Sequence, residues 1–164
     1  MLRPERLTVK AQEAVRDAID HARKRGNPVV NDAHLLAVLL AQDEGIVQPL
    51  LRKAGVVVPK LSNQVEAEVA TFPRQEGSEA QPTLDRTLTK VFDRADKLSK
   101  ELGDDYVSTE HLLLALTEEK GTTARRLLED AGMTGKDIRE ALSGVRGSHR
   151  VTDQTPEEKY QALE

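Results

Sequence analysis

The sequence contains no cysteine and no tryptophan, and its aromatic residues are limited to two phenylalanines and two tyrosines. Without cysteine there is no disulfide or thiolate chemistry, which fits a cytoplasmic location. So few aromatics argue against a base-stacking surface, and the net charge of −4 argues against a basic face for phosphates. No apolar run approaches the ~20 residues of a membrane span, and the start lacks a signal-peptide stretch. We therefore expect a protein that binds neither nucleic acid nor a membrane.

Enzyme motifs are also missing. The chain has no phosphate-binding loop, no dinucleotide-binding glycine pattern and no His-Glu-x-x-His. We expect no catalytic, cofactor-binding or metal-binding residue, and no nucleotide site. His34 and His111 could be imagined as a pair of metal ligands, but no third ligand has matching spacing. The favoured interpretation is that each histidine lies in the first turn of a buried helix and forms local hydrogen bonds.

What the sequence does contain is an internal repeat. When the chain is shifted by 77 positions, the stretch from Gly26 to Gly55 aligns with the stretch from Gly103 to Gly132. Ten residues in these thirty positions are identical, and the shared pattern includes a His-Leu-Leu triplet. This agreement indicates a duplicated unit.

Each unit shows four segments of helical periodicity. In the first unit they lie at 7–22, 35–40, 46–54 and 61–69; in the second they lie at 84–102, 112–116, 124–131 and 138–145. Asn31 or Asp32, and Ser108 or Thr109, are suitable N-caps for the two segments that are apolar on nearly all sides. No segment alternates long enough to predict a strand. The fold class is therefore all-α, and four helices are too few for an independent core, so both units should pack into one globule.

The boundaries follow from the breaks in periodicity. Repeat one spans about 5–72, a loop follows at 73–82, and repeat two spans about 83–146, so that 1–146 form one domain. The next stretch has little apolar content and is expected to be a mobile linker. Thr155 and Pro156 then suit an N-cap and first helical residue, so 147–164 should contain the linker and the start of a further module.

The stretch from Gly103 to Leu116, Gly-Asp-Asp-Tyr-Val-Ser-Thr-Glu-His-Leu-Leu-Leu-Ala-Leu, resembles the signature of the Clp N-terminal repeat family. A degenerate copy runs from Val30 to Leu36. The opening at 5–8 and the tail at 145–164 are similar to the ClpB disaggregases of that family. The resemblance implies a pseudo-twofold, eight-helix globule.

The resemblance also implies a function: a non-catalytic domain that captures unfolded or aggregated polypeptides for disaggregation. The fragment would be a monomer without a cofactor. Its parent would be a hexameric AAA+ ATPase that uses ATP and Mg and works with the DnaK chaperone system. Residues 147–164 would then be the linker and the start of the ATPase module.

Residues that the family uses for substrate capture map here onto three polar and four groove positions. They are Thr8, Asp104, Glu110, Leu88, Val91, Phe92 and His111. Structural alternatives exist for most of them. Thr8 suits a helix cap, Asp104 a turn, and Glu110 a helix dipole, whereas Val91 and Phe92 occupy core positions.

An alternative function is adaptor or phosphoarginine binding, as in the protease-coupled Clp relatives. That resemblance would require an acidic residue in each repeat. Glu110 is present in repeat two, but the equivalent position in repeat one is Ala33. The sequence therefore favours capture of unfolded protein.

Overall fold

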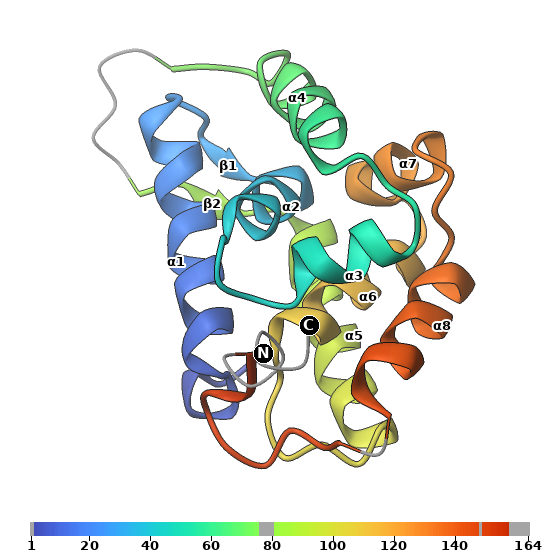
Figure 1. The fold of residues 1–164 in the computed structure, drawn as a ribbon. Helices are drawn as coiled ribbons and strands as arrows, with labels where there is room; N and C mark the ends of the chain where they lie inside the picture. Colours follow the sequence, from blue (N-terminus) through green and yellow to red (C-terminus); the bar gives the residue numbers. More distant parts are fainter. Residues whose placement is uncertain (1, 76–80, 148, 158–164) are drawn as a thin grey trace.

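The computed structural model describes residues 2–75, 81–147 and 149–157 (Figure 1). These residues form eight α-helices and two short strands, so the all-α prediction is confirmed. In chain order the elements are η1 (Pro4–Arg6), α1 (Val9–Lys24), β1 (Val29–Val30), α2 (Asp32–Ala41), α3 (Val47–Lys53), α4 (Val58–Val69), β2 (Thr83–Leu84), α5 (Arg86–Glu101), α6 (Thr109–Glu118), α7 (Thr123–Asp130) and α8 (Gly135–Arg146).

Helices α2 and α6 form the centre of the molecule. Their N-caps are Asn31 and Ser108, and each helix begins with a capping box in which the N3 histidine accepts the backbone N–H of the cap residue. The two histidines, His34 and His111, are fully buried. The prediction of buried first-turn histidines with local hydrogen bonds is therefore confirmed.

The two repeats pack together with approximate twofold symmetry. Across the repeat boundary, α1 contacts α6 as α5 contacts α2, and α4 contacts α7 as α8 contacts α3. Figure 1 shows the result, with α1 at the left, α8 at the right and α2, α3 and α6 between them. One continuous cluster of buried apolar residues draws on all eight helices. A single shared core thus holds both repeats.

Short parallel pairings, which the sequence did not predict, also join the repeats. Strand β1 pairs with β2, with Val30 opposite Leu84, and an isolated bridge pairs Leu7 with Val107. The second pair is the first with the repeats exchanged, since each residue lies 77 positions from its counterpart. The first residues of each repeat therefore pair with a short stretch of the other repeat. That stretch lies just before the other repeat's histidine-bearing helix, α2 or α6.

The chain after α8 differs from the expected mobile linker. Residues 149–157, here called the C-terminal segment, run beneath the helices from the end of α8 to the N-terminal end of α1 (Figure 1). Val151 and Glu157 in this segment are fully buried. The predicted helix at Pro156 begins within the described residues, but its continuation and part of the 73–82 loop lie outside them. The C-terminal segment is thus packed against the two repeats.

Candidate functional site

A polar cluster lies where the N-terminal ends of α1 and α6 meet the C-terminal end of α8. We define it as Thr8, Asp104, Glu110, His111 and Arg146. All five residues are at most 5% exposed. The cluster brings together all four polar side chains that the resemblance implied, which come from two repeats and three separate parts of the chain.

Asp104 is the hub of this cluster. Its Oδ2 atom lies 2.7 Å from Nε2 of His111 and accepts a 2.9 Å hydrogen bond from Nη1 of Arg146, while a second guanidinium nitrogen contacts Oδ1. Nδ1 of His111 accepts the backbone N–H of Ser108, so the ring donates to Asp104 through Nε2. The turn residue expected at position 104 is therefore also the centre of a buried ion-pair network.

The electrostatics of Asp104 follow from these partners. Burial alone would raise the pKa of its carboxyl group. The hydrogen bonds from His111 and Arg146, together with the backbone N–H of Val151, outweigh burial and lower the pKa to about 2. Asp104 therefore carries a negative charge at neutral pH.

Glu110 joins the same guanidinium from the first turn of α6. Its Oε2 atom lies 3.2 Å from Nη1 of Arg146, and its Oε1 atom accepts the hydroxyl of Ser108 at 2.7 Å. Oε2 has no hydrogen-bond partner by geometry, so it is held by charge alone. Glu110 thus contributes more than the favourable helix-dipole interaction that its position predicts.

Thr8 caps α1, as its structural alternative predicted, because its Oγ1 accepts the backbone N–H of Ala11 at 3.2 Å. The same hydroxyl donates to Oε2 of Glu157 at 2.7 Å. Thr8 therefore has two roles, as a helix cap and as a contact of the C-terminal segment.

The three apolar groove residues lie elsewhere. Leu88, Val91 and Phe92 are on the face of α5 that enters the shared core, and they are 1%, 0% and 8% exposed. Their burial agrees with the core alternative given for Val91 and Phe92. In this conformation the three side chains support the fold, and only Phe92 reaches the edge of the core.

Sequence reasoning missed two members of the site, Arg146 and Glu157. Neither has a local motif, because the site residues that each contacts lie more than thirty positions away. One signal was available for the arginine. The position equivalent to Asp104 in repeat one is Asn27, and an amide replaced by a carboxylate beside a buried histidine calls for a cationic partner.

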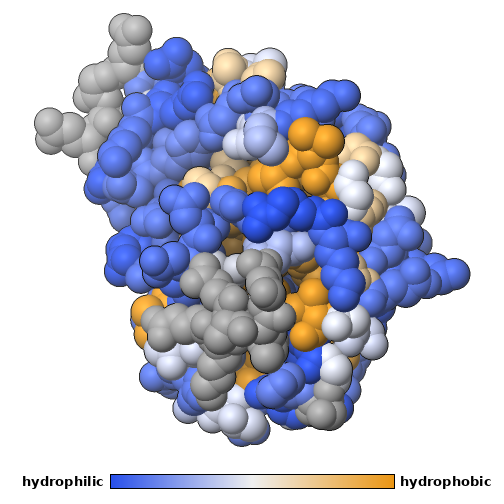
Figure 2. Space-filling model, viewed as in Figure 1, coloured by the Kyte–Doolittle hydropathy of each residue, from blue (hydrophilic) through white to orange (hydrophobic). Residues whose placement is uncertain are grey.

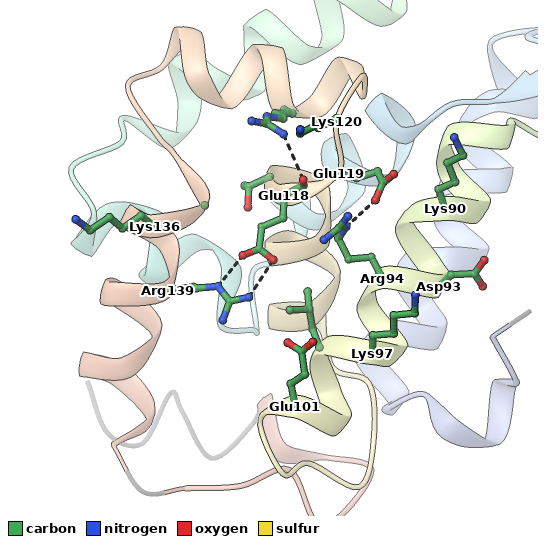
Figure 3. Close-up of a pocket in the computed structure, with 14 residues that line it drawn as sticks. Lys90, Asp93, Arg94, Lys97, Glu101, Glu118, Glu119, Lys120, Lys136 and Arg139 are labelled. Atoms are coloured by element: carbon green, nitrogen blue, oxygen red, sulfur yellow. Dashed lines mark hydrogen bonds and ion pairs between the residues drawn. The ribbon is translucent and has the colours of Figure 1, made fainter.

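A second concave region lies between α5, the end of α6 and the start of α8 (Figure 3). It has a volume of about 830 Å³ and a charged lining. Arg94 pairs with Glu119, and Arg139 pairs with Glu118, across this groove. Figure 3 shows lysines at its rim, including Lys90 and Lys136. The groove is open and polar, without the apolar floor of a small-molecule site.

Apolar side chains are exposed at several places on the described surface. Figure 2 shows a mainly hydrophilic face with hydrophobic patches of limited extent. Among the larger apolar side chains of the described residues, Val57 is the most exposed, at 64%. Over residues 2–75, 81–147 and 149–157, no group of three or more acidic or histidine side chains is placed to hold a metal ion. None of the described helices is long and apolar enough to cross a membrane.

Comparison with known proteins gives a family-level match over nearly the whole chain. A profile of the Clp repeat (R) N-terminal domain matches residues 6–158. The chain is 42% identical over 159 residues to the chaperone protein ClpB of Corynebacterium diphtheriae, and 37% identical over 161 residues to the mitochondrial chaperone protein ClpB3 of rice (Oryza sativa subsp. japonica). These alignments cover 96% and 98% of this chain but only 18% and 16% of the relatives.

Solved structures show the same fold. The Hsp104 N-terminal domain from Candida albicans has a TM-score of 0.82 at 22% identity, covering 92% of this chain and 98% of that one. A ClpV N-domain in complex with a VipB peptide has a TM-score of 0.66 at 24% identity, covering 85% and 86% of the two chains. At this level of identity the likeness concerns the fold alone.

Proposed function

Because the chain belongs to the family of Clp repeat (R) N-terminal domains, we propose that it is the substrate-binding domain of a ClpB-type chaperone. The family's N-domain is non-catalytic. The domain would capture unfolded or aggregated polypeptides and present them to a motor for disaggregation. Its relatives at 42% and 37% identity carry the name chaperone protein ClpB, and a related fold has been solved with a bound peptide.

One observation carries this proposal. The polar cluster already holds a stretch of polypeptide, the C-terminal segment, largely through main-chain atoms. Asp104 accepts the N–H of Val151, and the N–H of Asp105 donates to the carbonyl of Val151. The N–H of Val9 donates to the carbonyl of Gln154. Main-chain contacts of this kind do not depend on side-chain identity, which suits a domain that must accept many sequences.

The residues that would contact substrate are Thr8, Asp104 and Glu110. His111 would position the Asp104 carboxylate through the 2.7 Å contact. Leu88, Val91 and Phe92 lie apart from the cluster on the core-facing side of α5, and they would supply a separate apolar wall for the substrate. Phe92, at the edge of the core, is the member of this wall that a partner would reach first.

The proposal also covers the longer parent protein of which this chain would be one domain. The chain spans 18% or less of the length of the curated relatives described above. In the parent, ATP and Mg would act in AAA+ modules outside this domain, which would itself bind no nucleotide. The isolated domain would be a monomer. The parent would be a cytoplasmic hexamer that works with the DnaK chaperone system.

The alternative of phosphoarginine or adaptor binding has less support. The residue equivalent to Glu110 in repeat one is Ala33, which is fully buried. The neighbouring Asp32 is also buried, with one carboxylate oxygen accepting the N–H of Ala124 at 2.7 Å and the other accepting the hydroxyl of Thr87. Repeat one thus has alanine at the position of Glu110, and the carboxylate of the neighbouring Asp32 is taken up by contacts within the domain.

The experiment is an NMR titration of the ¹⁵N-labelled domain with reduced, carboxymethylated α-lactalbumin, which is permanently unfolded. We expect amide shifts at Thr8, Asp104 and Glu110. The native, folded form of the same protein is the matched control and should cause none. Shifts confined to the first repeat between residues 27 and 72, or no shifts at all, would contradict the proposal.

A further inference from the structure

The C-terminal segment contacts the polar cluster and the residues next to it at three points. Val151 forms two main-chain hydrogen bonds at one end, with the Asp104 carboxylate and the Asp105 N–H, at 2.8 and 2.7 Å. Gln154 receives the N–H of Val9 at 2.8 Å in the middle. Glu157 reaches the N-termini of α1 and α6 at the other end. Between them, Asp153 turns the chain by accepting the N–H of Thr155. The contacts therefore fix both the direction and the register of the segment.

The seat of Glu157 is built for a carboxylate. Its Oε2 atom accepts the hydroxyl of Thr8 at 2.7 Å and the backbone N–H of Thr109 at 3.3 Å. These donors stand at the first residues of two helices, α1 of sixteen residues and α6 of ten, whose dipoles both favour negative charge. The other oxygen, Oε1, is buried and has no partner. The carboxylate is therefore only half satisfied by its own domain.

The hold on this carboxylate is also weakened by its neighbours. Burial raises the pKa of the Glu157 carboxyl, and the Glu110 carboxylate raises it further, against the hydrogen bonds from Thr8 and Thr109. A group that is buried, half satisfied and repelled by a second carboxylate is an anchor that can be released.

We propose that this site binds a substrate segment in which an aliphatic residue is followed, six positions later and after a turn, by a carboxylate side chain. The C-terminal segment fills the site in cis, with Val151 and Glu157, whose side chains are both fully buried, in these two roles. It must leave before a substrate segment can bind. The inference rests on the proposed function and names its substrate class and its internal competitor.

Two observations support competition over a purely structural role for the segment. Every member of the cluster that the family resemblance implicates in capture is buried here, and the C-terminal segment touches two of them directly, Thr8 and Asp104. Such a site binds only in the fraction of molecules whose segment is released, and the apparent affinity is reduced by that fraction. Fixing or loosening the segment should therefore change binding without altering the site.

Locking the segment is the decisive test, and the chain contains no cysteine to interfere. In the double variant V9C/Q154C, the backbone hydrogen bond between the two residues places their main chains within disulfide range. Reduced, carboxymethylated α-lactalbumin is the probe, measured by fluorescence anisotropy. We expect the oxidised form to bind at least tenfold more weakly than the same protein after reduction.

Loosening the segment is the complementary test. Glu157→Gln removes the charge at the anchor and should strengthen binding about threefold to tenfold, whereas Glu140→Gln, at an exposed position of α8, should leave it unchanged. A synthetic peptide of residues 149–157 should compete with α-lactalbumin for the Glu157→Gln protein. The same peptide with glutamine in place of Glu157 should compete at least fivefold less well.

The outcomes separate the two proposals. Equal binding by the oxidised and reduced double variant would overturn the inference and leave the proposed function standing. If the disulfide does not form, the peptide comparison decides, and equal competition by the two peptides would overturn the carboxylate preference. Absence of binding by every form, including the reduced double variant and Glu157→Gln, would overturn the proposed function itself.

Discussion

The two repeats place a histidine at the same position and give it different partners. His34 and His111 each close the capping box of their helix through Nδ1. Nε2 of His34 faces Oδ1 of Asn27 at 2.9 Å, and Nε2 of His111 faces Oδ2 of Asp104 at 2.7 Å. The local geometry is thus duplicated, while the chemical group that receives the imidazole N–H has changed from an amide to a carboxylate.

The consequences of that change extend beyond the histidines. In repeat one, His34 lies among rings, with His21 at 5.6 Å and Phe72 at 5.5 Å between centroids. Burial, and then the charge of His21, lower the pKa of His34 to about 4, so it stays neutral. In repeat two, Asp104 brings in Arg146 and presents a carboxylate oxygen to the C-terminal segment. The difference between Asn27 and Asp104, together with that between Ala33 and Glu110, separates a structural cap in repeat one from a charged cluster in repeat two that holds the C-terminal segment.

Removing the carboxylate should cause the largest effect. Asp104→Ala removes the carboxylate that both terminal nitrogens of the buried Arg146 contact, and we expect it to lower the free energy of unfolding by about 3–5 kcal/mol. Asn27→Ala at the equivalent position removes only neutral hydrogen bonds, and we expect a loss of about 1–2 kcal/mol. Urea unfolding monitored by circular dichroism measures both. Equal losses would mean that the two repeats differ in sequence but not in electrostatics.

The equivalent positions Phe92 and Val15 sharpen the comparison for the apolar faces of α5 and α1. Phe92 is 8% exposed, so Phe92→Ala should lower the free energy of unfolding by about 3 kcal/mol. Val15 is only partly buried, and Val15→Ala should cost about 1 kcal/mol. Thermal unfolding and α-lactalbumin binding are measured together. Weaker binding with an unchanged thermal midpoint would make Phe92 a groove residue, whereas a lowered midpoint would keep it in the core.

The neutral histidine of repeat one predicts a smaller, pH-dependent effect. The folded pKa of His34, about 4, lies below the usual value of 6.5, so the unfolded chain takes up the proton first. The contribution of neutral His34 to the stability of the folded protein is therefore complete above pH 6.5 and is lost as the pH falls toward 4. Lowering the pH from 7.5 to 5 should remove about 2 kcal/mol. Urea unfolding at both values checks this, and His34→Gln should reduce the difference. An unchanged difference in that variant would refute the assignment.

Much of the fold could be predicted because its signals are local. Apolar spacing marked all eight helices, and Asn31 and Ser108 were among the caps expected for the two central helices. The small size of each four-helix unit predicted that both repeats share a core. The short strands were missed because two residues are too few to show alternation. The packing of residues 149–157 was missed because that stretch has little apolar content and is held mainly by hydrogen bonds.

The candidate site was only partly predictable. Resemblance pointed to Thr8, Asp104 and Glu110, and the structure brings these three together around Arg146 and Glu157. Sequence could not show that all three are buried, because exposure depends on what packs over a residue. Leu88, Val91 and Phe92 illustrate the same limit, since helical periodicity marks an apolar face without showing whether a core or a partner covers it.

The sequence alone determined the helices, the repeat of 77 residues and the family, because periodicity, capping and motifs act between residues close along the chain. The tertiary structure alone decided the charge environment and the accessibility of the site. Arg146 meets Asp104 across 42 positions, and Glu157 meets Thr8 across 149. A pKa and an exposed fraction depend on the atoms that surround a group in space, and no local pattern records which distant residues these will be.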